Sequence, residues 1–136
     1  MSPENNSLVK NLVAEGYLKT PDIINAFQKI NRADFVRESE KNIAYENSDL
    51  PIGYSQTISQ PLTVAFMIEL LAPQKGEKIL DIGSGSGWTA AILSELVGAG
   101  KKGKVIGLEL ISNLADFGRE NLKKYGFIKN KTVEII

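Results

Sequence analysis

The residues best suited to chemistry lie in one glycine-rich segment, Asp81-Ile82-Gly83-Ser84-Gly85-Ser86-Gly87-Trp88. Glycine accepts positive φ angles and lets a ligand approach the bare backbone, so a G-x-G-x-G turn after a strand can hold a nucleotide-like molecule. Asp81 stands two residues before the first glycine, where its charge would repel a pyrophosphate and attract an ammonium or sulfonium group. The segment therefore favours S-adenosylmethionine over a dinucleotide as its ligand.

Two further positions support this interpretation. Trp88 occupies the place where the dinucleotide fingerprint G-x-G-x-x-G requires its last glycine. Glu109 ends the next apolar run, where an acid can accept hydrogen bonds from both hydroxyls of a ribose. A glycine-rich loop can also be a plain connector, and Asp81 can instead accept hydrogen bonds from loop N–H groups. The residues expected here to bind the cofactor are Asp81, Gly83, Ser84, Gly85, Gly87, Glu109 and Leu110.

A second polar segment, residues 49–60, is rich in hydroxyl and amide side chains and shows no periodicity, which predicts a loop. It leads directly into a nearly all-apolar helix at 61–71, which we expect to be buried on most sides. Pro61 suits the first position of that helix, so Ser59 or Gln60 is its N-cap. Ser59 thus has two interpretations, as a helix cap or as a functional hydroxyl.

The elements that position these residues follow from the apolar pattern. Residues 78–82 are apolar on both faces, which is typical of a parallel strand buried on both sides. A helix from 88, a strand at 105–109, a helix capped by Ser112 and a strand from 132 follow, and this βαβαβ order is half of a doubly wound sheet. Two short amphipathic helices precede it, one capped by Ser7 and one starting at Pro21.

Composition excludes several functions. Sixteen basic and sixteen acidic side chains leave no net charge in 136 residues, so no global field attracts nucleic acid or an anionic membrane. The chain has no cysteine and no histidine, which excludes a thiolate nucleophile, a cysteine zinc cluster and a histidine base. No apolar run approaches the roughly 20 residues of a membrane span, and we predict a cytoplasmic protein without a metal.

Residues 49–61, the glycine-rich segment and Glu109 together resemble the protein-L-isoaspartate O-methyltransferase family, and Gln56-Thr57-Ile58-Ser59-Gln60-Pro61 is the most specific part. The resemblance implies an α/β, Rossmann-like methyltransferase fold that depends on S-adenosylmethionine. It further implies an N-terminal helical region with a substrate and cofactor loop at 1–60 and the first half of the methyltransferase domain at 61–136. The C-terminal half of the family fold has no counterpart in this sequence.

The implied activity is methylation of the α-carboxylate of L-isoaspartyl residues in damaged proteins or peptides. Ser59 would orient the substrate carboxylate, and Thr57, Ile58 and Ser59 would also contact the cofactor. The sequence departs mildly from the family, with Ser55 in place of glycine, Asp81 in place of glutamate and Trp88 in place of tyrosine. Asp81 is one methylene shorter than the usual acid, which changes its reach rather than its charge.

Two other functions stay open at this point. The chain could be a methyltransferase of the same fold that acts on RNA or a small molecule, or a truncated form that binds the cofactor without turnover. The topology also leaves one edge of the strand at 78–82 without a partner strand. We therefore expect self-association through that edge or completion by a second polypeptide, and little turnover by the isolated chain.

Overall fold

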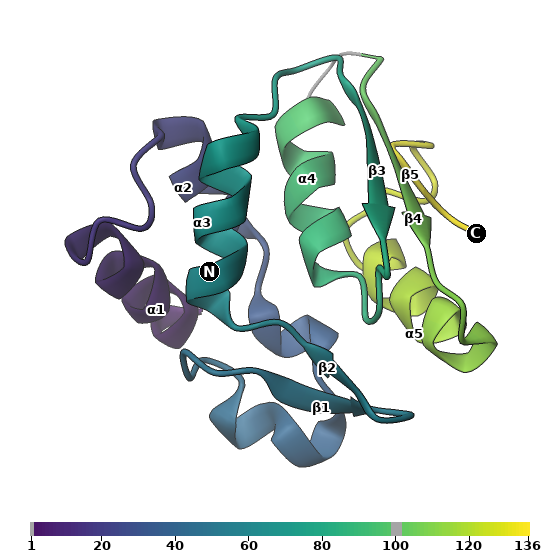
Figure 1. The fold of residues 1–136 in the computed structure, drawn as a ribbon, viewed down its shortest axis with the longest axis horizontal. Helices are drawn as coiled ribbons and strands as arrows, with labels where there is room; N and C mark the ends of the chain where they lie inside the picture. Colours follow the sequence, from purple (N-terminus) through teal and green to yellow (C-terminus); the bar gives the residue numbers. More distant parts are fainter. Residues whose placement is uncertain (1, 99–101) are drawn as a thin grey trace.

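The computed structural model describes residues 2–98 and 102–136, and its second half has the predicted βαβαβ order (Figure 1). The helices are α1 (Pro3–Ala14), α2 (Pro21–Lys29), α3 (Pro61–Leu71), α4 (Trp88–Gly98) and α5 (Ser112–Lys123), with short 3-10 helices at Arg32–Phe35 and Glu38–Ile43. The strands are β1 (Leu50–Gly53), β2 (Gln56–Ile58), β3 (Lys78–Ile82), β4 (Lys104–Leu108) and β5 (Val133–Ile135).

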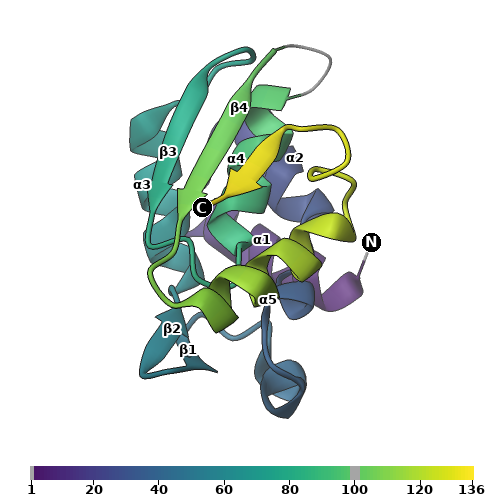
Figure 2. The ribbon, with the colours of Figure 1, turned by 90° about the vertical axis from the view of Figure 1, so that its right-hand side faces the viewer.

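The main sheet is parallel and its strand order is β3-β4-β5, as the sequence predicts. Ile79 lies opposite Val105, and Val105 lies opposite Val133, so these side chains form one apolar row across the sheet. Right-handed crossovers bring the connecting helices to the same face. Helix α4 contacts all three strands and α5 contacts β5, and Figure 2 looks onto the strands with α4 behind them.

The opposite face of the sheet is open, so the prediction that residues 78–82 are buried on both sides is wrong. Leu80 and Ile82 are 55% and 76% exposed, because no described element covers that face. The expectation for α3 is wrong in the same way, since its outer flank is exposed at Phe66, Met67, Leu70 and Leu71. Within residues 2–98 and 102–136, no helix is long and apolar enough to cross a membrane.

Helix α2 packs against α4, α1 packs against α2, and both helices share one hydrophobic core with the sheet. Helix α1 begins earlier than predicted, because Ser2 rather than Ser7 is its N-cap and Pro3 takes the first position. Helix α5 also differs at its start, where Ile111 rather than Ser112 is the N-cap. Helix α2 begins at Pro21 as predicted.

Residues 50–58 form an antiparallel hairpin of β1 and β2, whereas the sequence predicted a loop. The turn between the strands contains Tyr54 and Ser55, each with a φ of +58°. Such a turn usually contains Asn-Gly, because residues with a Cβ rarely adopt positive φ. The hairpin lies below the loop that joins β3 to α4 (Figure 1), and Ile52 packs against Gly85 in that loop.

Candidate functional site

The glycine-rich segment forms a tight turn between β3 and α4. Gly83 and Gly85 have φ angles of +77° and +53°, which favour glycine. The turn is fixed to the neighbouring strand, because the N–H groups of Gly83 and Ser84 donate to the carbonyl oxygen of Leu108 at 2.8 and 3.0 Å. The bare backbone of the turn therefore lies beside the carboxyl end of β4, where ligands of doubly wound folds bind.

Three buried polar atoms around this turn have no hydrogen-bond partner among the described residues: Oδ2 of Asp81, Oγ of Ser84 and Nε1 of Trp88. Among all the described residues only two other buried side-chain polar atoms lack a partner, so these three atoms are a local concentration. An unpartnered buried polar group costs about 1–3 kcal/mol, and native proteins keep few of them. No loop N–H donates to Asp81 Oδ2, so capping does not account for this oxygen.

The charge of Asp81 is also unfavourable in its present surroundings. Burial, and then the negative charge of Glu109, raise the pKa of Asp81 to about 6. A cation beside the carboxylate would offset both effects, because an opposite charge favours the ionised form. The site therefore favours a ligand with a positive group next to Asp81.

Glu109 connects the glycine turn to the start of α5. Its carboxylate accepts hydrogen bonds from the N–H of Gly85 at 3.3 Å and from the N–H of Ile111 at 3.2 Å. A carboxylate has about four lone-pair positions, so two remain for a ligand. The role of Glu109 as an acceptor for ribose hydroxyls stays a prediction. The structure adds a second role that the sequence did not indicate, since Glu109 joins the glycine turn to the start of α5.

Two adjoining pockets contain nine of the ten predicted site residues. The glycine-turn pocket, of about 40 Å³, is lined by Thr57, Ile58, Ser59, Asp81, Gly83, Ser84, Gly85, Ser86, Trp88 and Thr89. The Glu109 pocket, of about 420 Å³, is lined by Gln56, Ile82, Gly83, Leu108, Glu109, Leu110, Ile111 and Ile136. Gly83 lines both pockets. One ligand can therefore place a small charged group in the glycine-turn pocket and a larger group in the Glu109 pocket.

Gly87, the tenth predicted residue, lines neither of these two pockets. It has a φ of +92°, and a Cβ there would stand 3.3 Å from the carbonyl oxygen of Gly118 and from the side chain of Leu122. Gly87 therefore allows α4 and α5 to approach closely. Its predicted contact with a cofactor stays untested.

The hairpin brings Thr57, Ile58 and Ser59 to the glycine-turn pocket from the opposite side. Gln60 is the N-cap of α3, so the interpretation of Ser59 as the cap is wrong. The Ser59 side chain is exposed, and its hydroxyl makes no hydrogen bond to any residue that the structure describes. This hydroxyl is therefore available to a ligand in the pocket.

Arg32 was not indicated by the sequence as part of the site. It is fully buried, and its guanidinium donates to the carbonyl oxygen of Ser59 at 3.1 Å and lies 5.2 Å from the centre of the Trp88 ring. Its hydrogen-bond acceptors are backbone carbonyls of an irregular segment. No residue type or spacing could have identified them.

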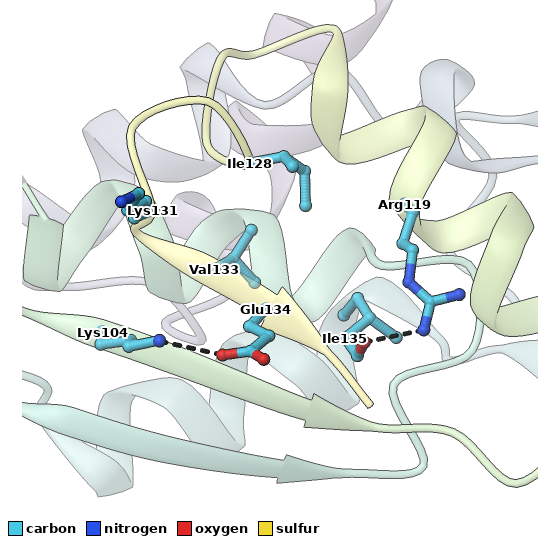
Figure 3. A pocket seen from close by; sticks show the side chains of 7 residues that line it. All are labelled: Lys104, Arg119, Ile128, Lys131, Val133, Glu134 and Ile135. Carbon is cyan, nitrogen blue, oxygen red and sulfur yellow. Dashed lines mark hydrogen bonds and ion pairs between the residues drawn. The ribbon is translucent and has the colours of Figure 1, made fainter.

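A third pocket, of about 280 Å³, lies beside β5 and contains none of the predicted site residues (Figure 3). Three of its four charged side chains are already engaged: Lys104 pairs with Glu134 at 2.9 Å, and Arg119 donates to the carbonyl oxygen of Ile135 at 2.8 Å. None of the residues that line this pocket has a buried polar atom without a partner, in contrast to the glycine turn.

Residues 3–135 match the profile of the protein-L-isoaspartate(D-aspartate) O-methyltransferase family. The chain belongs to this family. Among its curated relatives, the protein-L-isoaspartate O-methyltransferase of Ignicoccus hospitalis is 44% identical over 98% of the chain, and that of Methanopyrus kandleri is 48% identical over 88%. The chain covers 62% and 52% of the lengths of these two relatives.

Solved structures agree with this family membership. A Plasmodium falciparum protein assigned to the protein-L-isoaspartate O-methyltransferases, in complex with S-adenosyl-L-homocysteine, superimposes with a TM-score of 0.86 at 27% identity. The match covers 97% of this chain and 62% of that one. A second protein-L-isoaspartate O-methyltransferase superimposes with a TM-score of 0.83 at 27% identity, over 41% of its length. The predicted α/β methyltransferase fold is confirmed, and the chain represents part of it.

Proposed function

We propose that the protein transfers a methyl group from S-adenosyl-L-methionine to the α-carboxylate of L-isoaspartyl residues in damaged proteins. The observation that carries the proposal is the cluster of unpartnered polar atoms of Asp81, Ser84 and Trp88 around the glycine turn. Membership of the protein-L-isoaspartate O-methyltransferase family supports the choice of cofactor and substrate.

The residues present fit this cofactor. The Asp81 carboxylate would pair with the α-ammonium group, and the Ser84 hydroxyl and Trp88 Nε1–H would donate to the α-carboxylate of the same ligand. A Cβ added at Gly85 would stand only 3.2 Å from a methyl carbon of Ile52, so the close approach of these two residues favours glycine at this position. Glu109 would accept the ribose hydroxyls with the lone pairs left by its two backbone contacts.

Bound S-adenosylmethionine supplies a methyl group on a sulfonium leaving group. A substrate carboxylate is already ionised at pH 7, so the protein has no proton to remove, which agrees with the absence of histidine and cysteine from the sequence. The remaining task is alignment of the two reactants. Ser59, with its free hydroxyl at the pocket rim, would donate a hydrogen bond to the substrate carboxylate and orient it.

The activity test separates binding from turnover. Calorimetry with S-adenosyl-L-homocysteine is done on the 136-residue chain, and methyl transfer is measured in a chimera that adds the part of the Ignicoccus hospitalis relative that this chain does not cover. We expect transfer to a peptide with L-isoaspartate and none to the matched peptide with ordinary aspartate. Asp81→Asn in the chimera should abolish both binding and transfer. Absence of S-adenosyl-L-homocysteine binding by the unaltered chain would refute the proposal.

The same assay addresses the other candidate functions. Binding without transfer to the isoaspartyl peptide, in a chimera that is folded, would favour a form that only binds the cofactor. Transfer of the label to RNA or to small molecules, but not to the peptide, would favour a different methyltransferase of this fold.

We further propose that this chain self-associates through the open side of the sheet. The support is the free edge of β3 next to the exposed side chains of Leu80 and Ile82 and the exposed flank of α3. Unpaired strand edges and large exposed apolar patches are typical of interaction surfaces.

A further inference from the structure

Arg32 is a buried cation that is held by carbonyl oxygens and not by an acid. Its Nη1 donates to the carbonyl oxygens of Ala44 and Glu46 at 2.9 and 3.0 Å, and its Nη2 donates to those of Ser48 and Ser59 at 2.8 and 3.1 Å. None of the ion pairs among the described residues includes it. Burial lowers the pKa of Arg32 to about 10, so its charge is retained at neutral pH at a cost in free energy.

The acceptors of Nη2 lie at the two ends of the hairpin. Ser48 precedes β1 and Ser59 directly follows β2. Nη2 of Arg32 therefore joins the segment where the chain enters the hairpin to the segment where it leaves. The hairpin residues Thr57 and Ile58 line the glycine-turn pocket together with Ser59. Arg32 thus holds one wall of the pocket in place.

The opposite wall is also in contact with Arg32. Its Cζ lies 5.2 Å from the centre of the Trp88 ring, within the range of a cation–π interaction, and the Trp88 Nε1 is one of the three unpartnered atoms of the site. Phe27 packs edge-on against the same ring, with 5.8 Å between the ring centres. The ring is therefore held between an apolar neighbour and a cation, which fixes the direction of its N–H.

We propose that Arg32 is a positioning residue of the methyltransferase site, setting the distance between the Ser59 backbone and the Trp88 ring across the pocket. The inference rests on the proposed function for its ligand. A planar guanidinium with several donors in a fixed geometry can join these groups, whereas the single ammonium group of a lysine cannot reproduce the same set of contacts.

The test compares Arg32→Lys with Leu12→Ala, a truncation of a buried α1 residue that lines neither pocket of the site. Trp88 is the only tryptophan, so its fluorescence reports on the site without interference. For Arg32→Lys at 10 °C we expect acrylamide quenching to rise about twofold and the Kd for S-adenosyl-L-homocysteine to rise about tenfold, since charged hydrogen bonds to the wall are lost. Leu12→Ala should lower the unfolding midpoint and leave both quantities unchanged.

Unchanged quenching and affinity in Arg32→Lys would overturn the proposal, and so would equal changes in Leu12→Ala. Failure of the unaltered chain to bind S-adenosyl-L-homocysteine would instead refute the proposed function, and the quenching measurement would still decide the role of Arg32. If Arg32→Lys does not fold, NMR of the unaltered chain decides. Separate, slowly exchanging Nη signals of Arg32 would support its role as a positioning residue, and one averaged guanidinium signal would overturn that role.

Discussion

The charge of Asp81 should make the stability of the protein depend on pH in a direction opposite to that of most carboxylates. Its pKa of about 6 in the folded state lies above the ordinary value near 3.8. The folded state therefore binds this proton more tightly than the unfolded state, and protonation stabilises the fold. The stabilisation is complete below about pH 4 and is lost as the pH rises through 6.

The gap between the two pKa values, at about 1.4 kcal/mol per pKa unit, corresponds to about 3 kcal/mol of unfolding free energy. Asp81→Asn removes the charge and keeps the shape, so this variant should lack the decline between pH 4 and 7. At pH 7 it should be more stable than the unaltered chain by up to about 3 kcal/mol, and it should lose its ligand.

Urea unfolding followed by Trp88 fluorescence from pH 4.5 to 7.5 measures these changes. Asp116→Asn serves as the control, because this carboxylate is largely exposed and its pair with Arg119 contributes little. A decline with the same slope in the unaltered chain and in Asp81→Asn would refute the reasoning. Binding gives an independent check: near pH 6 a cationic ligand should release about half a proton, as seen by calorimetry in two buffers.

Four further outcomes are expected. Glu109→Gln should weaken S-adenosyl-L-homocysteine binding about tenfold, as one charged hydrogen bond is lost, and unchanged affinity in calorimetry would show that Glu109 does not bind the ligand. Ser59→Ala in the chimera should lower methyl transfer and leave the melting temperature nearly unchanged; full activity would remove its orienting role. Ser55→Gly should stabilise the chain by about 1 kcal/mol in urea unfolding, because positive φ suits glycine, and a loss would contradict the turn geometry. Light scattering should show concentration-dependent association that Leu80→Lys reduces, and a monomer at every concentration would argue against self-association through the open side.

The sequence predicted the centre of the fold well, because strong local signals coincide there. Pro61 fixes the start of α3, and the apolar run at 78–82 ends where the glycines begin, so both elements have their predicted limits. The order of the strands followed from the βαβαβ pattern of a doubly wound sheet. Two predicted N-caps were wrong: that of α1 is Ser2 and not Ser7, and that of α5 is Ile111, which has no side-chain cap for a sequence pattern to indicate.

Other features depend on tertiary contacts that no local pattern reports. The hairpin was missed because its turn contains Tyr54 and Ser55 instead of Asn-Gly. The exposure of Leu80 was missed because an apolar residue signals a preference for burial and not the presence of a neighbour to bury it. Arg32 was missed because its partners are backbone carbonyls, which every residue carries.

The electrostatics of the site predict that the charge of a ligand matters more than its shape. Asp81 and Glu109 place two acids beside one turn, and after burial the negative charge of Glu109 is the second cause of the raised pKa of Asp81. A pyrophosphate would add a third anion to the pair. A ligand with a positive centre would reduce the repulsion and supply the missing partner of Asp81 Oδ2 at once. We therefore expect the two acids to discriminate between nucleotide-like ligands that the glycine turn alone would accept equally.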